Sequence, residues 1–279
     1  MIHGQRTAWI FVLPAIAAIA LVAIVPMAWT VWESLHHHDL RMPWLGRPFV
    51  GVGNYVEAVN DPRFVGAFLR TAVFAAVSVA LELALGLVFA LAMSRASRGR
   101  AAIRLLVLTA WAIPTVVAAL VWRFMFEGGT TSWFADPLAA WVPIVLADGW
   151  KMTPFVALLL LAGLEAIDPT LYDAARMDGA SDWRQFREIT LPLLRPALLV
   201  AVLFRALDAF RVFDVIYVMT GGGPGTATEP VSLYTFNALL QHLRFGYGSA
   251  LSVIVFLTTF ALALLYIRLV GRQLLEAER

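Results

Sequence analysis

The stretch TAVFAAVSVALELALGLVFALAMS, residues 71–94, decides the fold class of this chain. It carries a single charge, Glu82, in a run long enough to cross about 30 Å of hydrocarbon, which takes about 20 helical residues. A bilayer core offers no water to the backbone, so only helices and closed barrels can span it. The stretch lacks the alternation of apolar and polar residues that a barrel strand requires. It therefore predicts a transmembrane helix.

Further segments along the chain have the same apolar character. They are residues 7–32, 105–122, 139–164, 196–220 and 245–267. The first of them is longer than the core of a signal peptide, about 7–15 residues, and we expect it to be retained as an anchor. The sequence thus predicts an all-α polytopic membrane protein with about six transmembrane helices. No linker interrupts it, so we expect residues 1–279 to form a single transmembrane domain.

Composition excludes several other classes of protein. The chain is 61% hydrophobic and 14% charged, against about 45–50% and 25% for a soluble domain. The absence of cysteine excludes disulfides, thiolate metal sites and cysteine nucleophiles. A net charge of +2 without a basic tract gives no reason to expect a nucleic-acid partner. We expect no metal site at His36, His37 and His38, because adjacent side chains cannot converge on one ion, and no catalytic residues.

Arginines in the loops predict the orientation, because cytoplasmic loops carry an excess of basic residues. With a cytoplasmic N-terminus, twelve arginines lie inside: Arg6, Arg95, Arg98, Arg100, Arg104, Arg176, Arg184, Arg187, Arg195, Arg268, Arg272 and Arg279. Six then lie outside: Arg41, Arg47, Arg63, Arg70, Arg123 and Arg244. The bias predicts that both termini are cytoplasmic.

The chain carries no nucleotide-binding P-loop. That motif requires Gly-Lys-Ser/Thr, and the only lysine, Lys151, follows Trp150. If ATP drives this protein, a partner must hydrolyse it. The glycine-rich residues 221–225 follow a predicted span and include Pro224, so they predict a hinge or tight turn rather than a dinucleotide site.

The cytoplasmic loop at about residues 164–196 contains LYDAARMDGASDWRQFREITLPLLRP, residues 171–196. This pattern predicts two short amphipathic helices that break at Asp178 and Gly179, where glycine permits a positive φ. We expect an apolar face made of Tyr172, Ala175, Met177 and Ala180, with Asp173, Arg176 and Asp178 in water. A helix lying on the membrane would be larger and more basic, so the pattern favours docking to a cytoplasmic partner.

Within this loop, Asp173-Ala174-Ala175 is followed after three residues by Gly179, and after nine more by Ile189-Thr190-Leu191-Pro192. The spacing resembles the hallmark of inner-membrane permease subunits of binding-protein-dependent ABC sugar importers, in which Glu occupies the place of Asp173. Further matches to this family are WKMTPF at residues 150–155, YVMTGGGP at 217–224 and GVGNY at 51–55. The resemblance covers most of the chain and points to the first permease of the maltose/trehalose type.

The resemblance implies a type I importer permease fold in the bacterial cytoplasmic (inner) membrane. A second permease would complete the translocation pathway, two copies of a cytoplasmic ATPase would use ATP and magnesium, and a solute-binding protein would deliver a sugar, for example trehalose or maltose. This chain would bind no cofactor and catalyse no reaction. Its ATPase-coupling residues would be Tyr172, Asp173, Ala174, Ala175, Met177, Asp178, Gly179 and Ala180.

Charged residues inside predicted spans are candidates for the solute pathway. Each charge at a bilayer centre costs about 2.5–3.5 kcal/mol on insertion scales, so exposure to lipid is excluded. The spacing of Arg205, Asp208, Arg211 and Asp214 fits either a self-neutralising ladder or a polar stripe, with Arg205 near the cytoplasmic mouth. The predicted pathway residues are Asp208, Arg211, Asp214, Tyr217 and Glu82.

Glu82 also has a structural interpretation, as the partner of an arginine on another helix. Gly86 and Ala90, four residues apart, predict close packing of that helix against a neighbour. Two alternative functions remain open at this point. One is a permease for glycerophosphate or another polyol, in which Arg211 meets phosphate, and the other is a membrane-embedded enzyme that uses Glu82 and Asp208.

Overall fold

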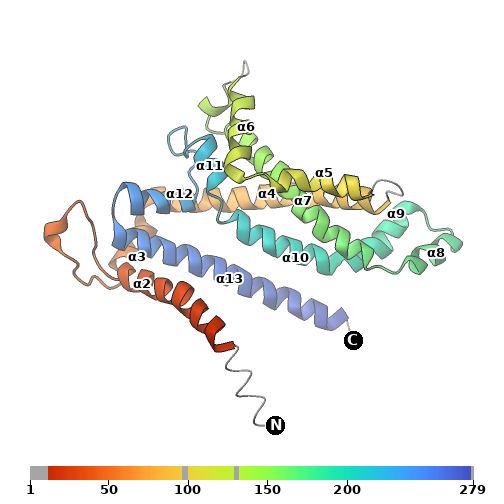
Figure 1. The fold of residues 1–279 in the computed structure, drawn as a ribbon, viewed down its shortest axis with the longest axis horizontal. Coiled ribbons are helices and arrows are strands. Elements are labelled where there is room, and N and C mark those ends of the chain that lie inside the picture. Colours follow the sequence, from red (N-terminus) through yellow and green to blue (C-terminus); the bar gives the residue numbers. More distant parts are fainter. Residues whose placement is uncertain (1–11, 96–99, 129–131, 278–279) are drawn as a thin grey trace, which may run out of the picture. The chain divides into compact units, whose positions relative to one another are not determined.

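A computed structural model describes residues 12–95, 100–128 and 132–277 (Figure 1). Within these ranges the chain forms helices and loops without a β-strand, apart from two isolated bridges, His36 to Phe49 and Asp39 to Arg244. The all-α prediction is confirmed. Of the arginines used to predict the orientation, Arg6, Arg98 and Arg279 lie outside the described residues.

The helical elements follow one another with short connections. The first half of the chain contains η1 (Ala20–Ile24), α2 (Val25–Ser34), η2 (Pro43–Leu45), α3 (Gly53–Asn60), α4 (Pro62–Arg95), α5 (Arg100–Ala112), α6 (Thr115–Glu127) and η3 (Trp133–Ala135). The second half contains α7 (Trp141–Glu165), α8 (Pro169–Met177), α9 (Asp182–Gln185), η4 (Phe186–Thr190), α10 (Leu191–Ala209), α11 (Asp214–Met219), α12 (Val231–Phe236), η5 (Asn237–Gln241) and α13 (Phe245–Ala277).

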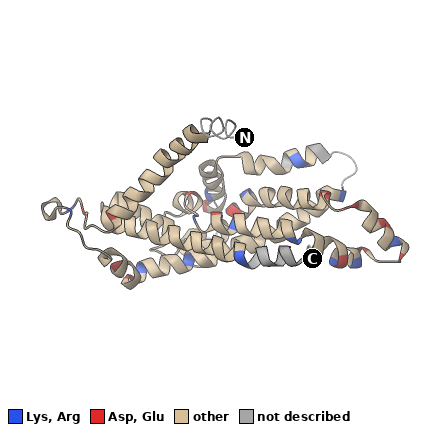
Figure 2. Ribbon diagram, turned by 90° about the horizontal axis from the view of Figure 1, so that it is seen from below, with Lys and Arg blue, Asp and Glu red and all other residues tan. Residues whose placement is uncertain are grey.

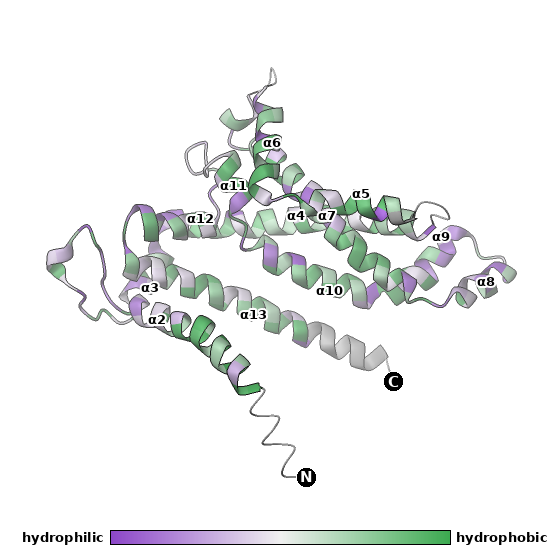
Figure 3. Cartoon of the chain, in the orientation of Figure 1, coloured by the Kyte–Doolittle hydropathy of each residue, from purple (hydrophilic) through white to green (hydrophobic). Residues whose placement is uncertain are grey.

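Five helical segments are long and apolar enough to cross a membrane. They are Val12–Ser34, Pro62–Arg95, Trp141–Glu165, Asp182–Ala209 and Phe245–Arg268. A sixth span results if the bent pair Ala102–Ala112 and Thr115–Glu127 counts as one. Hydrophobic colouring follows the long helices, whereas α8 and α9 are largely hydrophilic (Figure 3). The prediction of about six spans is confirmed.

The predicted span at residues 105–122 is not one continuous helix. It divides into α5 and α6, whose axes differ by 88°. Pro114 has an extended backbone (φ −55°, ψ 137°), lacks an N–H and disfavours the helical conformation of the preceding Ile113. The expectation of an uninterrupted helix is wrong because this proline ends the first half.

The predicted span at residues 196–220 is also wrong at its C-terminal end. Helix α10 finishes at Ala209, where the amides of Arg211 and Val212 bond to carbonyls only three residues back, those of Asp208 (3.0 Å) and Ala209 (3.2 Å). Such tightening is common at helix ends. A separate helix, α11, begins at Asp214, so the predicted ladder of charges on a single helix does not exist beyond Asp208.

The chain divides into two compact units. Unit 1 comprises Met1–Gly66 and Tyr234–Thr258. In its described part, Asp61 precedes α4 and accepts a bond from the amide of Arg63 (2.8 Å) and bonds from the hydroxyls of Tyr234 and Tyr247. Burial raises the pKa of Asp61, but these hydrogen bonds outweigh it and the net shift is downward. The carboxylate thereby ties the start of α4 to α12 and α13.

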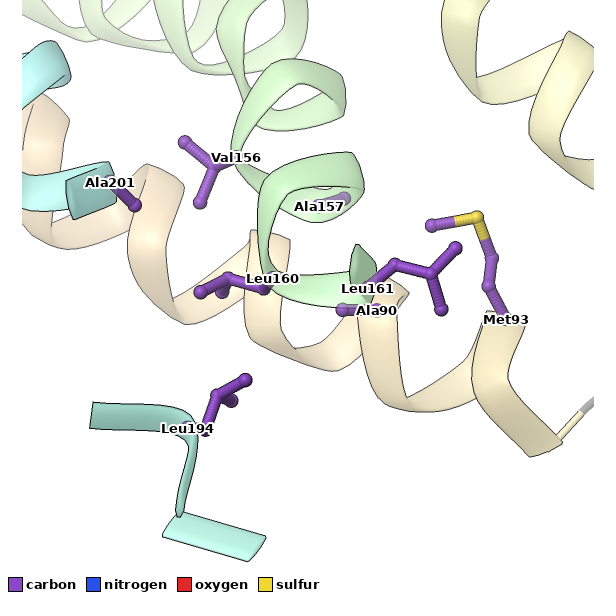
Figure 4. Packing of buried hydrophobic residues seen from close by; sticks show 8 residues of the cluster. All are labelled: Ala90, Met93, Val156, Ala157, Leu160, Leu161, Leu194 and Ala201. Carbon is purple, nitrogen blue, oxygen red and sulfur yellow. The ribbon is translucent and has the colours of Figure 1, made fainter. Parts of the chain in front are cut away.

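Unit 2 comprises Ala67–Leu233 and Thr259–Arg279. Its hydrophobic core lies between α4, α7 and α10 (Figure 4). The buried residues of this core are Ala90, Met93, Val156, Ala157, Leu160, Leu161, Leu194 and Ala201. A Cβ added at Gly86 would lie 2.5 Å from Cγ1 of Val156, so no larger residue fits without a shift. The predicted close packing at Gly86 and Ala90 is confirmed.

Candidate functional site

The first candidate site is the α8–α9 segment, residues 168–185, which begins with a capped helix. The Asp168 carboxylate accepts a bond from the amide of Thr170 at 2.9 Å, and Pro169 occupies the first helical turn. Both features favour a helix start at this point. The bond from the Thr170 amide lowers the pKa of Asp168, as expected for a carboxylate that caps a helix in its charged form.

The end of α8 is defined by Gly179. The Ala180 amide bonds to the carbonyl of Ala175 (2.9 Å), and the Gly179 amide bonds to that of Arg176 (3.0 Å), the pattern of a Schellman cap. Gly179 has φ +76°, and a Cβ at this position would meet nothing within 4 Å. The requirement for glycine is therefore conformational rather than steric, and the predicted break at Asp178 and Gly179 is confirmed.

Side chains on α8 point in two directions. Tyr172, Ala175 and Ala180 are half-buried, and the Tyr172 hydroxyl lies 3.0 Å from the Thr190 hydroxyl on η4. Met177 is 89% exposed, so it does not share the predicted apolar face with Tyr172. That part of the expectation is wrong, because Met177 follows Tyr172 by five residues, which places it about 140° further around a helix of 3.6 residues per turn and on another face of α8.

Exposed residues of the α8–α9 segment combine charged and large apolar side chains. Arg176 pairs with Asp173 at 3.0 Å, and charged residues recur through this end of unit 2 while the long helices are mostly uncharged (Figure 2). Trp183 is 69% exposed and stacks on Phe186. The segment is held in place by the Gln185 amide, which donates to the carbonyl of Ala180 at 2.9 Å. It is a prefolded element with apolar side chains in solvent.

The second candidate site is a buried ion cluster in unit 2. Arg205 on α10 is 1% exposed, and its guanidinium binds both carboxylate oxygens of Glu82 on α4. Asp148 on α7 lies 3.2 Å from the same guanidinium, and Asp208 accepts a bond one turn along α10. Glu82 therefore has the arginine partner that its structural interpretation requires. Arg205 is buried between its own helix, α10, and helices α4 and α7, which contribute Glu82 and Asp148.

Exposure distinguishes the carboxylates of this cluster. The Glu82 side chain is 0% exposed and that of Asp148 is 13% exposed, whereas that of Asp208 is 48% exposed. Asp208 is thus the most exposed carboxylate of the cluster. Asp148 was not among the site residues predicted from the sequence. The signal for a role was an acid inside an apolar segment, which needs a partner.

The other predicted pathway residues lie after the end of α10, in the turn that follows it and on α11. Arg211 is exposed in the turn after α10, and Asp214 is exposed in the first turn of α11. Tyr217 on α11 is 46% exposed, and its ring stacks on Phe213 with centroids 5.3 Å apart. These residues occupy different elements rather than one helical stripe.

The fold defines the class of protein first. A crystal structure of a bacterial ABC transporter involved in the import of the acidic polysaccharide alginate has the same fold, with a TM-score of 0.84, 20% identity and 97% of both chains covered. Residues 82–274 match the family described as "Binding-protein-dependent transport system inner membrane component". The chain belongs to this family and is a permease of the ABC importer type.

Two relatives are similar over nearly their full length. The trehalose/maltose transport system permease protein MalF of Thermococcus litoralis is 41% identical over 96% of this chain and 94% of its own. The trehalose transport system permease protein SugA of Mycobacterium tuberculosis is 39% identical over 96% of this chain and 89% of its own. Both relatives are named as transport system permeases, which supports a transport role over the alternative of a membrane-embedded enzyme.

Proposed function

We propose that this chain forms one half of the translocation pathway of an ATP-driven importer for a disaccharide such as trehalose or maltose. The names of the two relatives support this class of solute. A second permease completes the pathway, and a solute-binding protein delivers the sugar from outside. The chain crosses the bacterial cytoplasmic membrane several times, and both termini lie in the cytoplasm, as the distribution of arginines favours.

The α8–α9 segment docks to the ATPase. One observation carries this proposal: the α8–α9 segment exposes Met177 at the end of α8 and Trp183 on α9, and α8 is capped at both ends by Asp168 and Gly179. Exposed apolar groups on a prefolded element favour binding to another protein, because little ordering is needed on association. The remaining coupling residues of the prediction lie on the same helix and its cap.

The partner supplies the energy. Two copies of an ATPase bind ATP and magnesium, since this chain has no P-loop lysine. Closure of the ATPase pair displaces the docked α8, and the displacement passes into the helices that flank it, α7 and α10. Rigid helices that shift in this way open a cavity to one side of the membrane or the other.

The pathway proposal concerns Asp208 first. Its half-exposed carboxylate accepts hydrogen bonds from sugar hydroxyls, while Glu82 holds Arg205 in the helix bundle. Arg211, Asp214 and Tyr217 are exposed and remain candidates for further contacts with the solute. In this assignment Glu82 does not contact the sugar, and its role is to bind Arg205.

Copurification tests the docking proposal. The Ala175→Arg variant places a charge on the half-buried face of α8, and we expect it to lose the ATPase from the purified complex while the chain still inserts. Ala166→Arg is the matched control, because Ala166 is exposed at the end of α7, outside the predicted coupling residues. Retention of the ATPase and normal uptake by Ala175→Arg would contradict the docking role.

Uptake into proteoliposomes tests the solute. With binding protein supplied, trehalose or maltose should stimulate ATP hydrolysis and accumulate inside, whereas glycerophosphate should do neither. Asp208→Ala should lower sugar uptake by about tenfold, the loss of one hydrogen bond to a charged group, with the ATPase still bound. Transport of glycerophosphate with loss in Arg211→Ala would instead select the polyol alternative.

A further inference from the structure

The break between α5 and α6 leaves backbone carbonyls that need hydrogen-bond donors. The proposed function does not account for how they are satisfied. A helix that ends inside a bilayer leaves its last carbonyls without intrahelical donors, and lipid supplies none. Pro114 removes one further N–H at this position. The carbonyls of Trp111 and Ile113 lie at the break. Something else in the protein must satisfy them.

Lys151 does so from a different helix. Its ammonium, on α7, donates to the carbonyl of Trp111 at 3.2 Å and to that of Ile113. The side chain is only 9% exposed, and it is the single lysine of the chain. A cation at the C-terminal end of a helix is also favoured by the helix dipole. One side chain thus supplies donors and compensating charge at the break.

The neighbours of Lys151 contact both halves of the broken span. Trp150 lies against Trp122 on α6, with ring centroids 6.2 Å apart, and Phe155 stacks on Trp111 of α5 at 6.3 Å. Residues 150–155 are the WKMTPF match noted in the sequence. This short stretch of α7 therefore touches α5, the break and α6.

Helix α6 also contacts α11, in addition to α7. It packs along α11, and the Arg123 guanidinium donates to the carbonyl of Val218 at 3.1 Å (Figure 1). The bent arrangement is thus supported at α7 and at α11. Loss of either support would favour a straighter α5–α6 segment.

We propose that Lys151 is the positioning residue that holds α6 at its angle to α5. Because α7 continues from Lys151 to Glu165, directly before the α8–α9 segment, a displacement of α8 moves the same helix that holds the break. The α5–α6 angle then responds to the ATPase cycle. This assignment goes beyond the proposed function, and its principal measurement does not depend on the solute.

Distances between spin labels test the proposal. The chain has no cysteine, so Leu105→Cys and Phe124→Cys provide the only labelling sites, and both side chains are exposed (68% and 77%). A straight helix would separate the two positions by about 28 Å along its axis at 1.5 Å per residue, and the bent pair holds them closer. We expect a short, narrow distance distribution for the full chain in nanodiscs and a longer, broader one in Lys151→Met.

Two further variants distinguish positioning from general stability. Lys151→Arg retains a cationic donor and should restore the short distance. Thr153→Val is the matched control, because Thr153 lies on the same helix, is 3% exposed, and its hydroxyl has no partner in the described part of the chain. We expect Lys151→Met to lower uptake by about tenfold with the ATPase still bound, and Thr153→Val to leave uptake and distance unchanged.

An unchanged distance distribution in Lys151→Met would overturn the proposal, whatever the effect on uptake. Equal broadening in Thr153→Val would overturn it as well, since the effect would then belong to α7 as a whole. If Lys151→Met does not insert, Lys151→Gln, whose amide still donates, is measured instead. A wild-type distance between the labels in Lys151→Gln supports the assignment if Pro114→Ala, which removes the cause of the break, lengthens that distance. An unchanged distance in Pro114→Ala would overturn the assignment, because the labels would then not report the angle between α5 and α6.

Discussion

The buried ion cluster and the α8–α9 segment, both in unit 2, differ in which side chains they expose to solvent. In the cluster, Arg205 and Glu82 are excluded from solvent and bind each other. In the segment, the pair Asp173 and Arg176 has side chains that are 72% and 63% exposed, and the apolar Met177 is 89% exposed. Polar groups are buried in one region, and apolar groups are exposed in the other.

This difference indicates which substitutions each region tolerates. A buried ion pair cannot lose one partner without leaving an uncompensated charge, a loss of about 3–5 kcal/mol. An exposed pair contributes about 0–1 kcal/mol, so its charges can change at little energetic cost. In the α8–α9 segment the sensitive features are instead backbone shape and apolar surface. Asp173 stands where the family has Glu, and its side chain belongs to this exposed pair, in which a change costs little energy.

The largest expected effect comes from Arg205→Ala. It leaves Glu82 and Asp148 without their cation, and we expect a loss of about 3–5 kcal/mol of stability. The midpoint of thermal unfolding in detergent should fall sharply, and the yield of monodisperse protein with it. Arg211→Ala, the exposed control on the neighbouring turn, should change stability by no more than about 0.5 kcal/mol. Equal midpoints of thermal unfolding for both variants would contradict the expectation that the buried arginine contributes more to stability than the exposed one.

Gly86→Val tests the packing beside the cluster. The new Cβ would lie 2.5 Å from Cγ1 of Val156, so we expect overpacking to reduce stability by about 1–3 kcal/mol. Thermal unfolding again provides the measurement. The double variant Gly86→Val with Val156→Ala should recover only part of the loss, because it removes Cγ1 of residue 156 but leaves its Cβ at 2.9 Å. A stable Gly86→Val would show that α4 and α7 separate without cost.

The sequence was sufficient for those features that depend on local pattern. Hydrophobic runs predicted the helical class and the number of spans, and Gly179 marked the end of α8 because only a local φ is involved. The end of α10 was missed because apolar residues continue past Ala209, so hydropathy does not mark the turn. The bend at Pro114 was missed because proline is tolerated inside many transmembrane helices.

Partners far apart in the chain could not be derived. Arg205 lies 123 residues from Glu82, and its bond to Asp148 joins a third helix. The sequence indicated that each buried charge needs a partner, but the choice of partner depends on how α4, α7 and α10 pack. Lys151 shows the same limit, because its acceptors are backbone carbonyls that every residue possesses.

Gly179→Ala tests the backbone of the α8–α9 segment. A residue other than glycine at φ +76° costs about 1–2 kcal/mol, although space is available for the methyl group. We expect affinity for the ATPase to fall by about tenfold, with little change in thermal unfolding. Gly225→Ala is the control, since Gly225 has φ +60° and an added Cβ would meet nothing within 4 Å, but it lies outside this segment. Equal losses of affinity in both variants would exclude a specific role for α8.

The smallest effect concerns the cap of α8. The pKa of Asp168 is lowered in the folded chain by the Thr170 amide, so its contribution is complete above the unfolded value of about 3.9 and is lost as the pH falls below it. The protection factor of the Thr170 amide, which is its exchange rate corrected for the intrinsic pH dependence of exchange, should therefore fall on acidification. Asp168→Asn, which caps without ionising, should abolish that pH dependence. A pH dependence that persists in this variant would place the titrating group elsewhere.

The ion pair between Glu82 and Arg205 also constrains biogenesis. Helix α4 leaves the ribosome well before α10, so the acid enters the bilayer during synthesis without its counter-ion. Asp148 on α7 follows in the same condition, and both wait until residue 205 has been translated. A nascent chain that stops between α7 and α10 therefore holds two acids in the membrane without their arginine, and its folding cannot be completed until α10 is inserted.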